Sequence, residues 1–147
     1  MRSIAVLGAG SWGTALAIHL ARAGHDVRLW ARDASVVDDL TSARVNALYL
    51  PGAPLPAGIE PTASLASAVD GAGFIVGAVP SHGLRTVIRA AAPNFAAGAI
   101  LVSATKGIET GTLQRMSEVM NGESAGRFPI VVLSGPSFAA EVARGQP

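Results

Sequence analysis

The chain has 147 residues, of which 50% are hydrophobic and 14% are charged, and its formal net charge is +1. This length supports one domain, and the small charge argues against nucleic acid or an anionic membrane surface as a partner. The absence of cysteine from the sequence excludes disulfides and thiolate metal sites. No apolar run approaches the roughly 18 to 20 residues of a membrane span. We therefore expect a cytoplasmic protein that binds a small molecule, without a metal site.

A glycine-rich turn follows the first predicted strand. Residues 4–7 are a short continuous apolar run, which is typical of a parallel strand buried on both faces. Gly8, Gly10 and Gly13 then form the pattern G-x-G-x-x-G before a helix predicted over 14–23. In this pattern the first glycine permits a tight turn, the second lets the backbone approach a pyrophosphate, and the third lets the helix lie close to the sheet. The three glycines predict a dinucleotide site.

A second strand, predicted over 26–31, completes the βαβ unit that the glycine pattern requires. Two neighbouring residues after it compete for the ribose of the cofactor. Asp33 lies at the usual distance for a carboxylate that binds the ribose, but it also precedes a helical stretch that it could cap. Arg32 could bind a 2′-phosphate instead. We favour Arg32, and with it NADP over NAD.

Residues 42–61 differ from the rest of the chain because they contain prolines at four positions, 51, 54, 56 and 61. Such a segment is predicted to be neither a regular helix nor a central strand. Loops of this length are usually functional or disordered. Tyr49 and Leu50 favour order, because they give the loop apolar side chains to pack. The plainer alternative is an excursion over the edge of the sheet. A short strand is predicted to end at Thr62.

The remaining sequence alternates between predicted helices and strands. Helices are expected over 64–69, capped by Ser64, and over 83–92 and 112–120; strands are expected over 73–79, 100–103 and 128–133. This alternation predicts an α/β fold of the Rossmann type, doubly wound, with a mainly parallel sheet and helices on both faces. Parallel strands bring their carboxyl ends to one edge, which places Pro80 at the cofactor edge. His19 and His25 are interpreted as structural, and His82 as a solvated histidine at a helix start.

Lys106 is the only lysine in a chain with 11 lysine and arginine residues, and it follows the strand 100–103. Its compact ammonium suits a carbonyl oxygen or a phosphate better than the planar fork of arginine does. The last strand runs into a segment with Gly135 and Ser137, where Ser137 could cap a helix whose first N–H groups bind an anion. A capped turn without a ligand is the plainer interpretation of that segment.

Six segments, taken in order, resemble a known family. They are G-A-G-S-W-G at 8–13, L-W-A-R at 29–32, N-A-L-Y-L-P-G at 46–52, A-V-P-S at 78–81, A-T-K-G-I-E at 104–109 and S-G-P-S-F-A-A-E-V at 134–142. Together they are similar to the N-terminal domain of bacterial NAD(P)-dependent glycerol-3-phosphate dehydrogenase. The resemblance covers essentially the whole chain and implies an NAD(P)-binding Rossmann domain over 1–147.

The resemblance implies that sn-glycerol 3-phosphate and dihydroxyacetone phosphate are interconverted for phospholipid synthesis, with NADPH favoured although relatives also accept NADH. It also implies roles for individual residues. Ser11 and Trp12 would contact the dinucleotide phosphates, Arg32 the 2′-phosphate, Tyr49 the adenosine side, Lys106 both cofactor and substrate, Gly135 and Ser137 the substrate, and Ala139 the cofactor through its backbone.

The resemblance further implies a second, helical domain that carries the proton-transferring lysine and most of the substrate phosphate site. No catalytic residue is therefore assigned within this chain, which we expect to bind dinucleotide with little or no turnover. Self-association through exposed apolar surface is expected, and a homodimer is possible. Two alternatives are a stand-alone dinucleotide-binding or sensing module and the Rossmann domain of another two-domain reductase acting on a hydroxy or keto acid.

Overall fold

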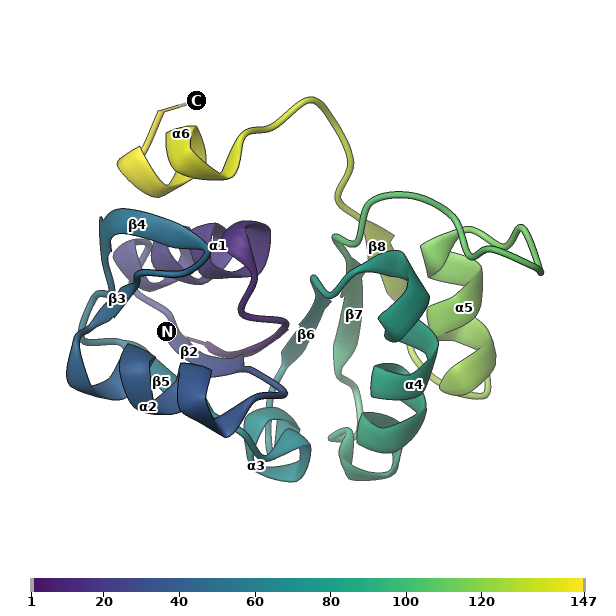
Figure 1. Cartoon of the computed structure of the whole chain (residues 1–147). Helices are drawn as coiled ribbons and strands as arrows, with labels where there is room; N and C mark the ends of the chain where they lie inside the picture. The colour runs from purple at the N-terminus through teal and green to yellow at the C-terminus, as the bar shows by residue number, and fades with distance from the viewer. Residues whose placement is uncertain (1, 147) are drawn as a thin grey trace.

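A parallel six-stranded sheet forms the centre of the protein (Figure 1). The computed structural model describes residues 2–146, so the two end residues of the predicted domain 1–147 lie outside the described part. The strands are β1 (Ser3–Leu7), β2 (Asp26–Trp30), β5 (Ile59–Thr62), β6 (Phe74–Gly77), β7 (Ile100–Ser103) and β8 (Ile130–Val132). Their order is β5-β2-β1-β6-β7-β8, with every neighbouring pair parallel. The chain winds outward from β1 in one direction and from β6 in the other, which confirms the doubly wound Rossmann prediction.

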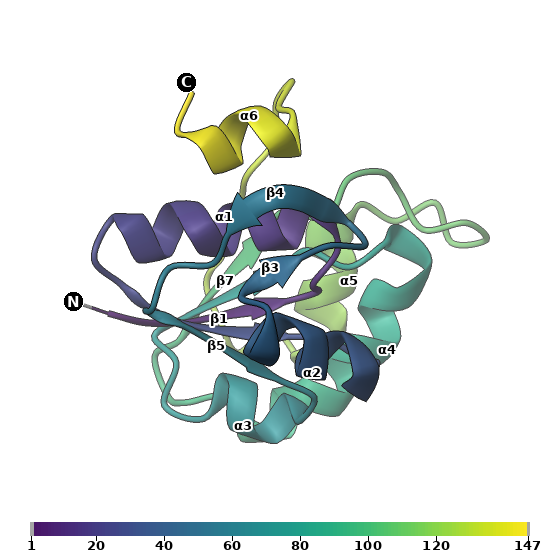
Figure 2. The ribbon, with the colours of Figure 1, turned by 60° about the vertical axis from the view of Figure 1, so that its left-hand side comes forward.

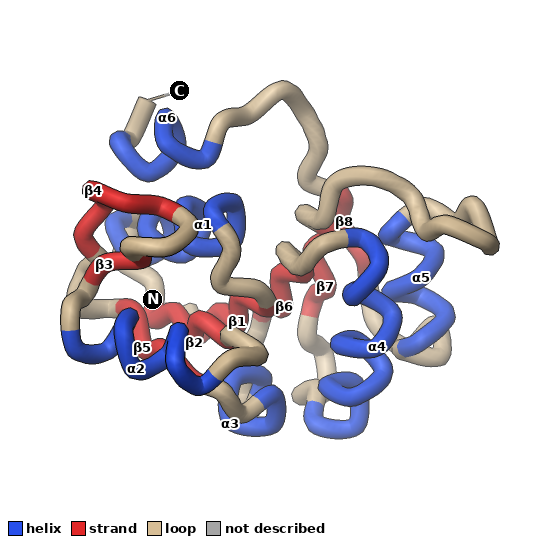
Figure 3. The backbone as a smooth tube through the Cα atoms, viewed as in Figure 1, coloured by secondary structure: helices blue, strands red, loops and turns tan. Residues whose placement is uncertain are grey.

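Helices cover both faces of the sheet, as Figure 3 shows. The helices are α1 (Ser11–Arg22), α2 (Ala34–Ser42), α3 (Leu65–Val69), α4 (Ser81–Ala91), α5 (Met116–Glu123) and α6 (Ala139–Arg144). The last of them, α6, packs on α1 and β4 (Leu50–Pro54) rather than on the six-stranded sheet. Alternate residues of β1 supply the two cores: Ile4 and Val6 pack in the core with α1, whereas Ala5 and Leu7 pack in the core with α4 and α5. Within residues 2–146, no helix has the length and apolar character that crossing a lipid bilayer requires.

The proline-rich segment forms a hairpin, which the sequence did not predict. Strand β3 (Val45–Asn46) pairs antiparallel with β4 (Leu50–Pro54) in a separate two-stranded sheet that lies beside α1 and α2 (Figure 2). The prediction of a plain loop is wrong here because β4 pairs on one side only, and an edge strand tolerates proline. Pro61 is tolerated for a similar reason, since β5 is an edge strand of the main sheet. Leu50 is buried, as expected for an ordered segment.

Several element boundaries differ from those predicted. Helix α1 begins at Ser11 rather than at 14, α4 begins at Ser81 rather than at 83, and β8 has three residues rather than the expected span of 128–133. The largest difference is α5, which was predicted over 112–120. Leu113 has a positive φ of 58°, which ends any helix there, and the Glu118 carboxylate accepts a hydrogen bond of 2.9 Å from the Arg115 N–H. This cap makes the helix begin at Met116.

Candidate functional site

The glycine turn, defined here as residues 8–14, joins β1 to α1 at the carboxyl edge of the sheet. Gly8 has φ +124°, and a Cβ there would lie 2.9 Å from backbone atoms of Ala78 and Val79. A Cβ on Gly13 would lie 1.8 Å from the Gly8 carbonyl oxygen. At Gly10, by contrast, no described atom lies within 4 Å of an added Cβ. Packing therefore requires the first and third glycines, while the second faces open space.

This open side fits the phosphates of a dinucleotide. Gly10 is the N-cap of α1, and Ser11 is exposed at its first position. The first N–H groups of a helix have no acceptor within the helix and carry partial positive charge. Among the described residues, the first turn of α1 contains no acidic side chain that would repel an anion. The turn also lies where the strand order reverses, the usual ligand position in open α/β sheets.

The end of β2 lies beside the glycine turn, because the Gly8 N–H donates a hydrogen bond of 3.0 Å to the carbonyl oxygen of Trp30. Arg32 follows two residues later and is exposed. Asp33 accepts a hydrogen bond of 3.0 Å from the Ser35 N–H and caps α2. This backbone hydrogen bond and a second one from the Ser35 hydroxyl lower the pKa of Asp33. The capping interpretation of Asp33 is thus confirmed, and Arg32 stays the candidate for the ribose side.

Lys106 lies at the centre of a second group of predicted residues. Its Nζ donates a hydrogen bond of 3.0 Å to the carbonyl oxygen of Ser137 and lies 5.2 Å from the centroid of the Trp12 ring. The Trp12 Nε1–H in turn donates a hydrogen bond of 3.0 Å to the carbonyl oxygen of Ala104. Trp12 lies in the first turn of α1, Lys106 follows β7 and Ser137 follows β8, so the fold brings together three segments that are far apart in the sequence.

These residues line a cavity of about 650 Å³. The described residues around it are Trp12, Ser103, Thr105, Lys106, Gly107, Arg115, Met116, Ser117, Val132, Leu133, Ser134, Gly135, Pro136 and Ser137. Two of these are cations and none is a carboxylate, so the cavity suits an anionic ligand. The sequence did not single out Thr105, Arg115, Met116 or Ser117; only Thr105, which adjoins Lys106, had a positional signal.

The lysine loop, defined here as residues 104–115, is held in place by ion pairs. Arg85 on α4 donates to both carboxylate oxygens of Glu109 at 2.7 Å, and it also pairs with Glu123 on α5. Arg89 donates to the same Glu123 carboxylate at 2.8 Å. The hydrogen bonds from Arg85 and then from Thr112 lower the pKa of Glu109 to about 2. Glu109 stays ionised at neutral pH, and the loop stays tied to two helices.

The prediction that Ser137 caps α6 is wrong. The N-cap is Phe138, which makes no side-chain capping hydrogen bond, and the Ser137 hydroxyl lies 3.5 Å from the Gly135 carbonyl oxygen instead. The chain turns at Gly135, where φ is +151°, and α6 begins only at Ala139. Ser137 therefore lies one residue before the N-cap position and does not cap the helix. Ser137 instead contributes its carbonyl oxygen to the lining of the cavity, where it accepts the hydrogen bond from Lys106.

The other predicted cofactor residues are not among those that line this cavity. Tyr49 is 50% exposed, and its N–H donates a hydrogen bond of 3.1 Å to the Asn46 side chain. Pro80 is exposed directly before α4, and Ala139 is half-buried at the first position of α6. Among the histidines, His19 and His82 are exposed. The third, His25, has a buried Nδ1 without a hydrogen-bond partner among residues 2–146.

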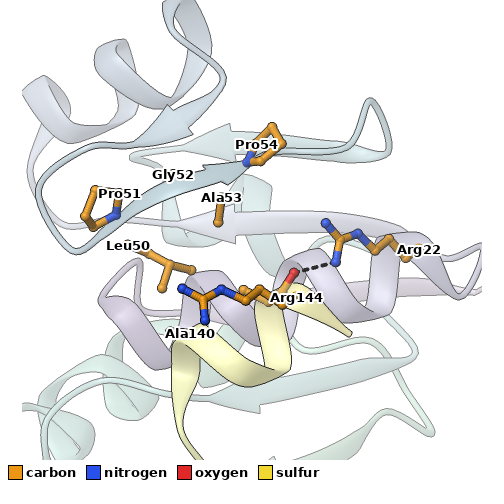
Figure 4. Close-up of a pocket in the computed structure, with 9 residues that line it drawn as sticks. Arg22, Leu50, Pro51, Gly52, Ala53, Pro54, Ala140 and Arg144 are labelled. Atoms are coloured by element: carbon orange, nitrogen blue, oxygen red, sulfur yellow. Dashed lines mark hydrogen bonds between the residues drawn. The ribbon is translucent and has the colours of Figure 1, made fainter. Parts of the chain in front are cut away.

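A smaller cavity of about 190 Å³ lies between β4, α1 and α6 (Figure 4). The Arg22 side chain on α1 donates a hydrogen bond to the carbonyl oxygen of Ala143 on α6, and this bond links the two helices. None of the predicted site residues is among those described around this cavity. Within residues 2–146, no group of three or more histidine, aspartate and glutamate side chains could hold a metal ion.

Comparison with known proteins accounts for this arrangement. A family model described as the N-terminus of NAD-dependent glycerol-3-phosphate dehydrogenase matches residues 3–147. The chain belongs to this family. It is 49% identical over 144 residues to glycerol-3-phosphate dehydrogenase (NAD(P)+) of Thioalkalivibrio sulfidiphilus, covering 98% of this chain and 43% of that relative. It is also 47% identical to a corresponding protein of Mycobacterium tuberculosis, with 99% and 44% covered.

A solved structure agrees with this membership. The crystal structure of glycerol-3-phosphate dehydrogenase from Coxiella burnetii superposes with a TM-score of 0.92 at 40% identity, covering 99% of this chain and 44% of that one. A ketopantoate reductase from Ralstonia eutropha has a TM-score of 0.62 at 20% identity, which shows a shared fold alone. The family match therefore favours glycerol-3-phosphate dehydrogenase over the alternative of another two-domain reductase. The chain spans less than half the length of the relatives that it matches.

Proposed function

We propose that residues 1–147 are the cofactor-binding domain of an enzyme that interconverts sn-glycerol 3-phosphate and dihydroxyacetone phosphate with NAD(P)H. The observation that carries this proposal is the convergence of Trp12, Lys106 and Ser137 on one cavity that begins beside the glycine turn. Membership of the dehydrogenase family supports the same assignment.

The dinucleotide would lie along the carboxyl edge of the sheet. The N–H groups of Ser11 and Trp12 would bind its pyrophosphate, with Gly8, Gly10 and Gly13 shaping the turn beneath it. Arg32 would bind the ribose side and Tyr49 would lie near the adenosine. Pro80 would line the path of the cofactor toward the cavity, and Ala139 would contact the cofactor through its backbone.

The substrate would occupy the cavity around Lys106, Gly135 and Ser137. Two cationic side chains and no carboxylate among its described lining residues suit a phosphate ester. A bound nicotinamide supplies the hydride chemistry. Lys106 would bind the carbonyl oxygen of the substrate and stabilise the negative charge that develops there. Because no residue described here is assigned to proton transfer, we expect this chain alone to bind cofactor with little or no turnover.

The preference for NADPH tests the assignment of Arg32. We expect calorimetric titration of the 147-residue chain to show tighter binding of NADPH than of NADH. The substitution Arg32→Ala should erase that advantage and leave NADH binding nearly unchanged, because a guanidinium reads the extra 2′-phosphate. Arg28→Ala, which removes an arginine that is already bound to Ser3 and Ser67, serves as the matched control. An NADPH advantage that survives Arg32→Ala would contradict the assignment.

Other features of the proposal concern the setting of the protein. A cytoplasmic location, a homodimer and the lack of a nucleic-acid partner stay predictions.

The edge strand β8 and the segment after it expose four apolar side chains. They are Val131, Val132, Leu133 and Phe138, with exposed fractions of 52%, 57%, 47% and 69%. This apolar surface supports the expectation that copies of the isolated chain associate.

A further inference from the structure

Asn46 is a buried polar residue that neither the glycine pattern nor the family resemblance assigns to a role. It lies at the end of β3 in the proline-rich hairpin, and its exposed fraction is 2%. Thr14, with an exposed fraction of 0%, is its neighbour in space although the two are 32 residues apart in the sequence. A buried amide needs several partners, because it carries two N–H donors and an acceptor oxygen.

The Asn46 amide finds its partners on the glycine turn. Its Nδ2 donates one hydrogen bond of 2.9 Å to the carbonyl oxygen of Ala9 and another of 2.8 Å to the Thr14 hydroxyl. Ala9 lies between Gly8 and Gly10, and Thr14 lies in the first turn of α1. The two hydrogen bonds therefore bracket the residues whose N–H groups face the open side of the turn.

The other end of the amide holds the hairpin. Its Oδ1 accepts a hydrogen bond of 3.1 Å from the Tyr49 N–H, and Asn46 pairs with Leu50 in the hairpin register. Leu50 is 5% exposed and packs in the same core as Ala9. Glycines allow the shape of the turn, but they leave its backbone free to adopt other conformations because they have no side chain to restrict it. The restriction is supplied across space by the hairpin.

We propose that Asn46 is a positioning residue for the dinucleotide site, whose side-chain amide fixes residues 9–14 in the binding conformation and couples them to the hairpin that carries Tyr49. This inference rests on the proposed binding of dinucleotide at the glycine turn. Asn46 touches no cofactor itself; it acts through Ala9 and Thr14.

The experiment compares Asn46→Ala and Asn46→Asp with Leu48→Ala in the 147-residue chain. Leu48 belongs to the same hairpin and is 70% exposed, so its substitution is the matched control. Hydrogen exchange of the cofactor-free chain is measured by mass spectrometry, and NADPH binding by calorimetry. We expect exchange in residues 8–16 to accelerate by about tenfold or more in both Asn46 variants, with peptides from β6 and β7 unchanged, because both variants lose the buried hydrogen bond from Asn46 to the Ala9 carbonyl oxygen.

The dissociation constant for NADPH should rise by roughly tenfold or more in both Asn46 variants, as expected for the loss of at least one such bond. For Leu48→Ala we expect it to stay within about twofold, as for an exposed side chain outside the network of hydrogen bonds that Asn46 makes. Asn46→Asp adds a pH readout that a merely structural role would not produce. An ionised carboxylate cannot donate to the Ala9 carbonyl, whereas a protonated carboxyl group can. Because burial raises the pKa of a carboxyl group, the affinity of Asn46→Asp should recover as pH falls, and the affinity of Asn46→Ala relative to the unsubstituted chain should not.

Three results would overturn the inference: unchanged exchange in residues 8–16, equal acceleration throughout the sheet, or unchanged NADPH affinity in both Asn46 variants. If those variants do not fold, Thr14→Val carries the same comparison, since it removes one of the two acceptors of the amide. If a folded, unsubstituted chain binds neither NADPH nor NADH, the proposed function fails. The exchange measurement still decides, in that case, whether Asn46 holds the turn.

Discussion

The glycine turn and the lysine loop lie at the same edge of the sheet, but different forces hold them. The turn is held by close backbone packing around Gly8 and Gly13 and by the neutral hydrogen bonds of buried Asn46. The loop is held by neutral hydrogen bonds of Ala104 and Thr105 and, in addition, by partly exposed ion pairs between Arg85, Glu109 and Glu123. Steric contacts and buried neutral hydrogen bonds do not depend on pH or salt, whereas ion pairs near the surface depend on both. The glycine turn is thus held without ion pairs, whereas the lysine loop also depends on them.

The largest effect should come from breaking the turn at Gly13. We expect Gly13→Ala to lower the free energy of unfolding by about 3 kcal/mol or more, because the new methyl group would meet the Gly8 carbonyl. Gly10→Ala is the matched variant, since its methyl group would enter open space from a backbone with φ −74°. Its stability should change by less than about 1 kcal/mol, while NADPH binding weakens by more than about tenfold. Equal losses of stability in urea unfolding of the two variants would contradict this account of the turn.

Removing the charge of Lys106 should have a smaller effect, limited to the binding of NADPH. We expect Lys106→Met to weaken NADPH binding by about three- to tenfold, because a charge-assisted hydrogen bond to the ligand is lost. Its free energy of unfolding should change by less than about 0.5 kcal/mol, since Lys106 is exposed. Lys106→Arg keeps the charge but changes its geometry, and it should recover only part of the affinity. Calorimetry that gives the same dissociation constant for all three chains would exclude Lys106 from the cofactor site.

The smallest effect should be the response of the lysine loop to acid. In the folded chain the pKa of Glu109, about 2, lies below its ordinary value of 4.5. The ionised Glu109 therefore stabilises the fold fully above that ordinary value, and its contribution is lost as pH falls from about 4.5 toward 2. In urea unfolding, Glu109→Gln should be less stable than the unsubstituted chain at pH 7, and the difference should shrink in acid. A difference for Glu109→Gln that stays constant with pH would contradict the ion-pair account.

The elements that could be predicted from the sequence are those fixed by local patterns. The apolar run 4–7 and the glycine spacing located β1 and the turn, because burial on both faces and the steric needs of Gly8 and Gly13 are local properties. Strand β7 was predicted with its observed limits, Ile100–Ser103. Asp33 and Ser64 were recognised as caps, since capping depends on residues only two or three positions away.

The elements that could not be predicted depend on contacts between distant segments. The hairpin β3–β4 is stabilised by pairing and by burial of Leu50 against the core, and its prolines concealed it. The start of α5 depends on the positive φ of Leu113, which propensity does not reveal. Within the site, the position of Lys106 after β7 was evident, but its contact with the Ser137 carbonyl was not. The sequence assigned Asn46 no role of its own, because its partners on the glycine turn lie more than 30 positions away.

The most direct test of the central claim is a crystal structure of this chain bound to NADPH. We predict that the pyrophosphate lies against the N–H groups of Ser11 and Trp12, above Gly10, with the nicotinamide ring directed into the cavity that Lys106 lines. The 2′-phosphate should contact Arg32. A pyrophosphate bound elsewhere, for example in the cavity between Arg22 and Arg144, would contradict the claim that the glycine turn is the dinucleotide site.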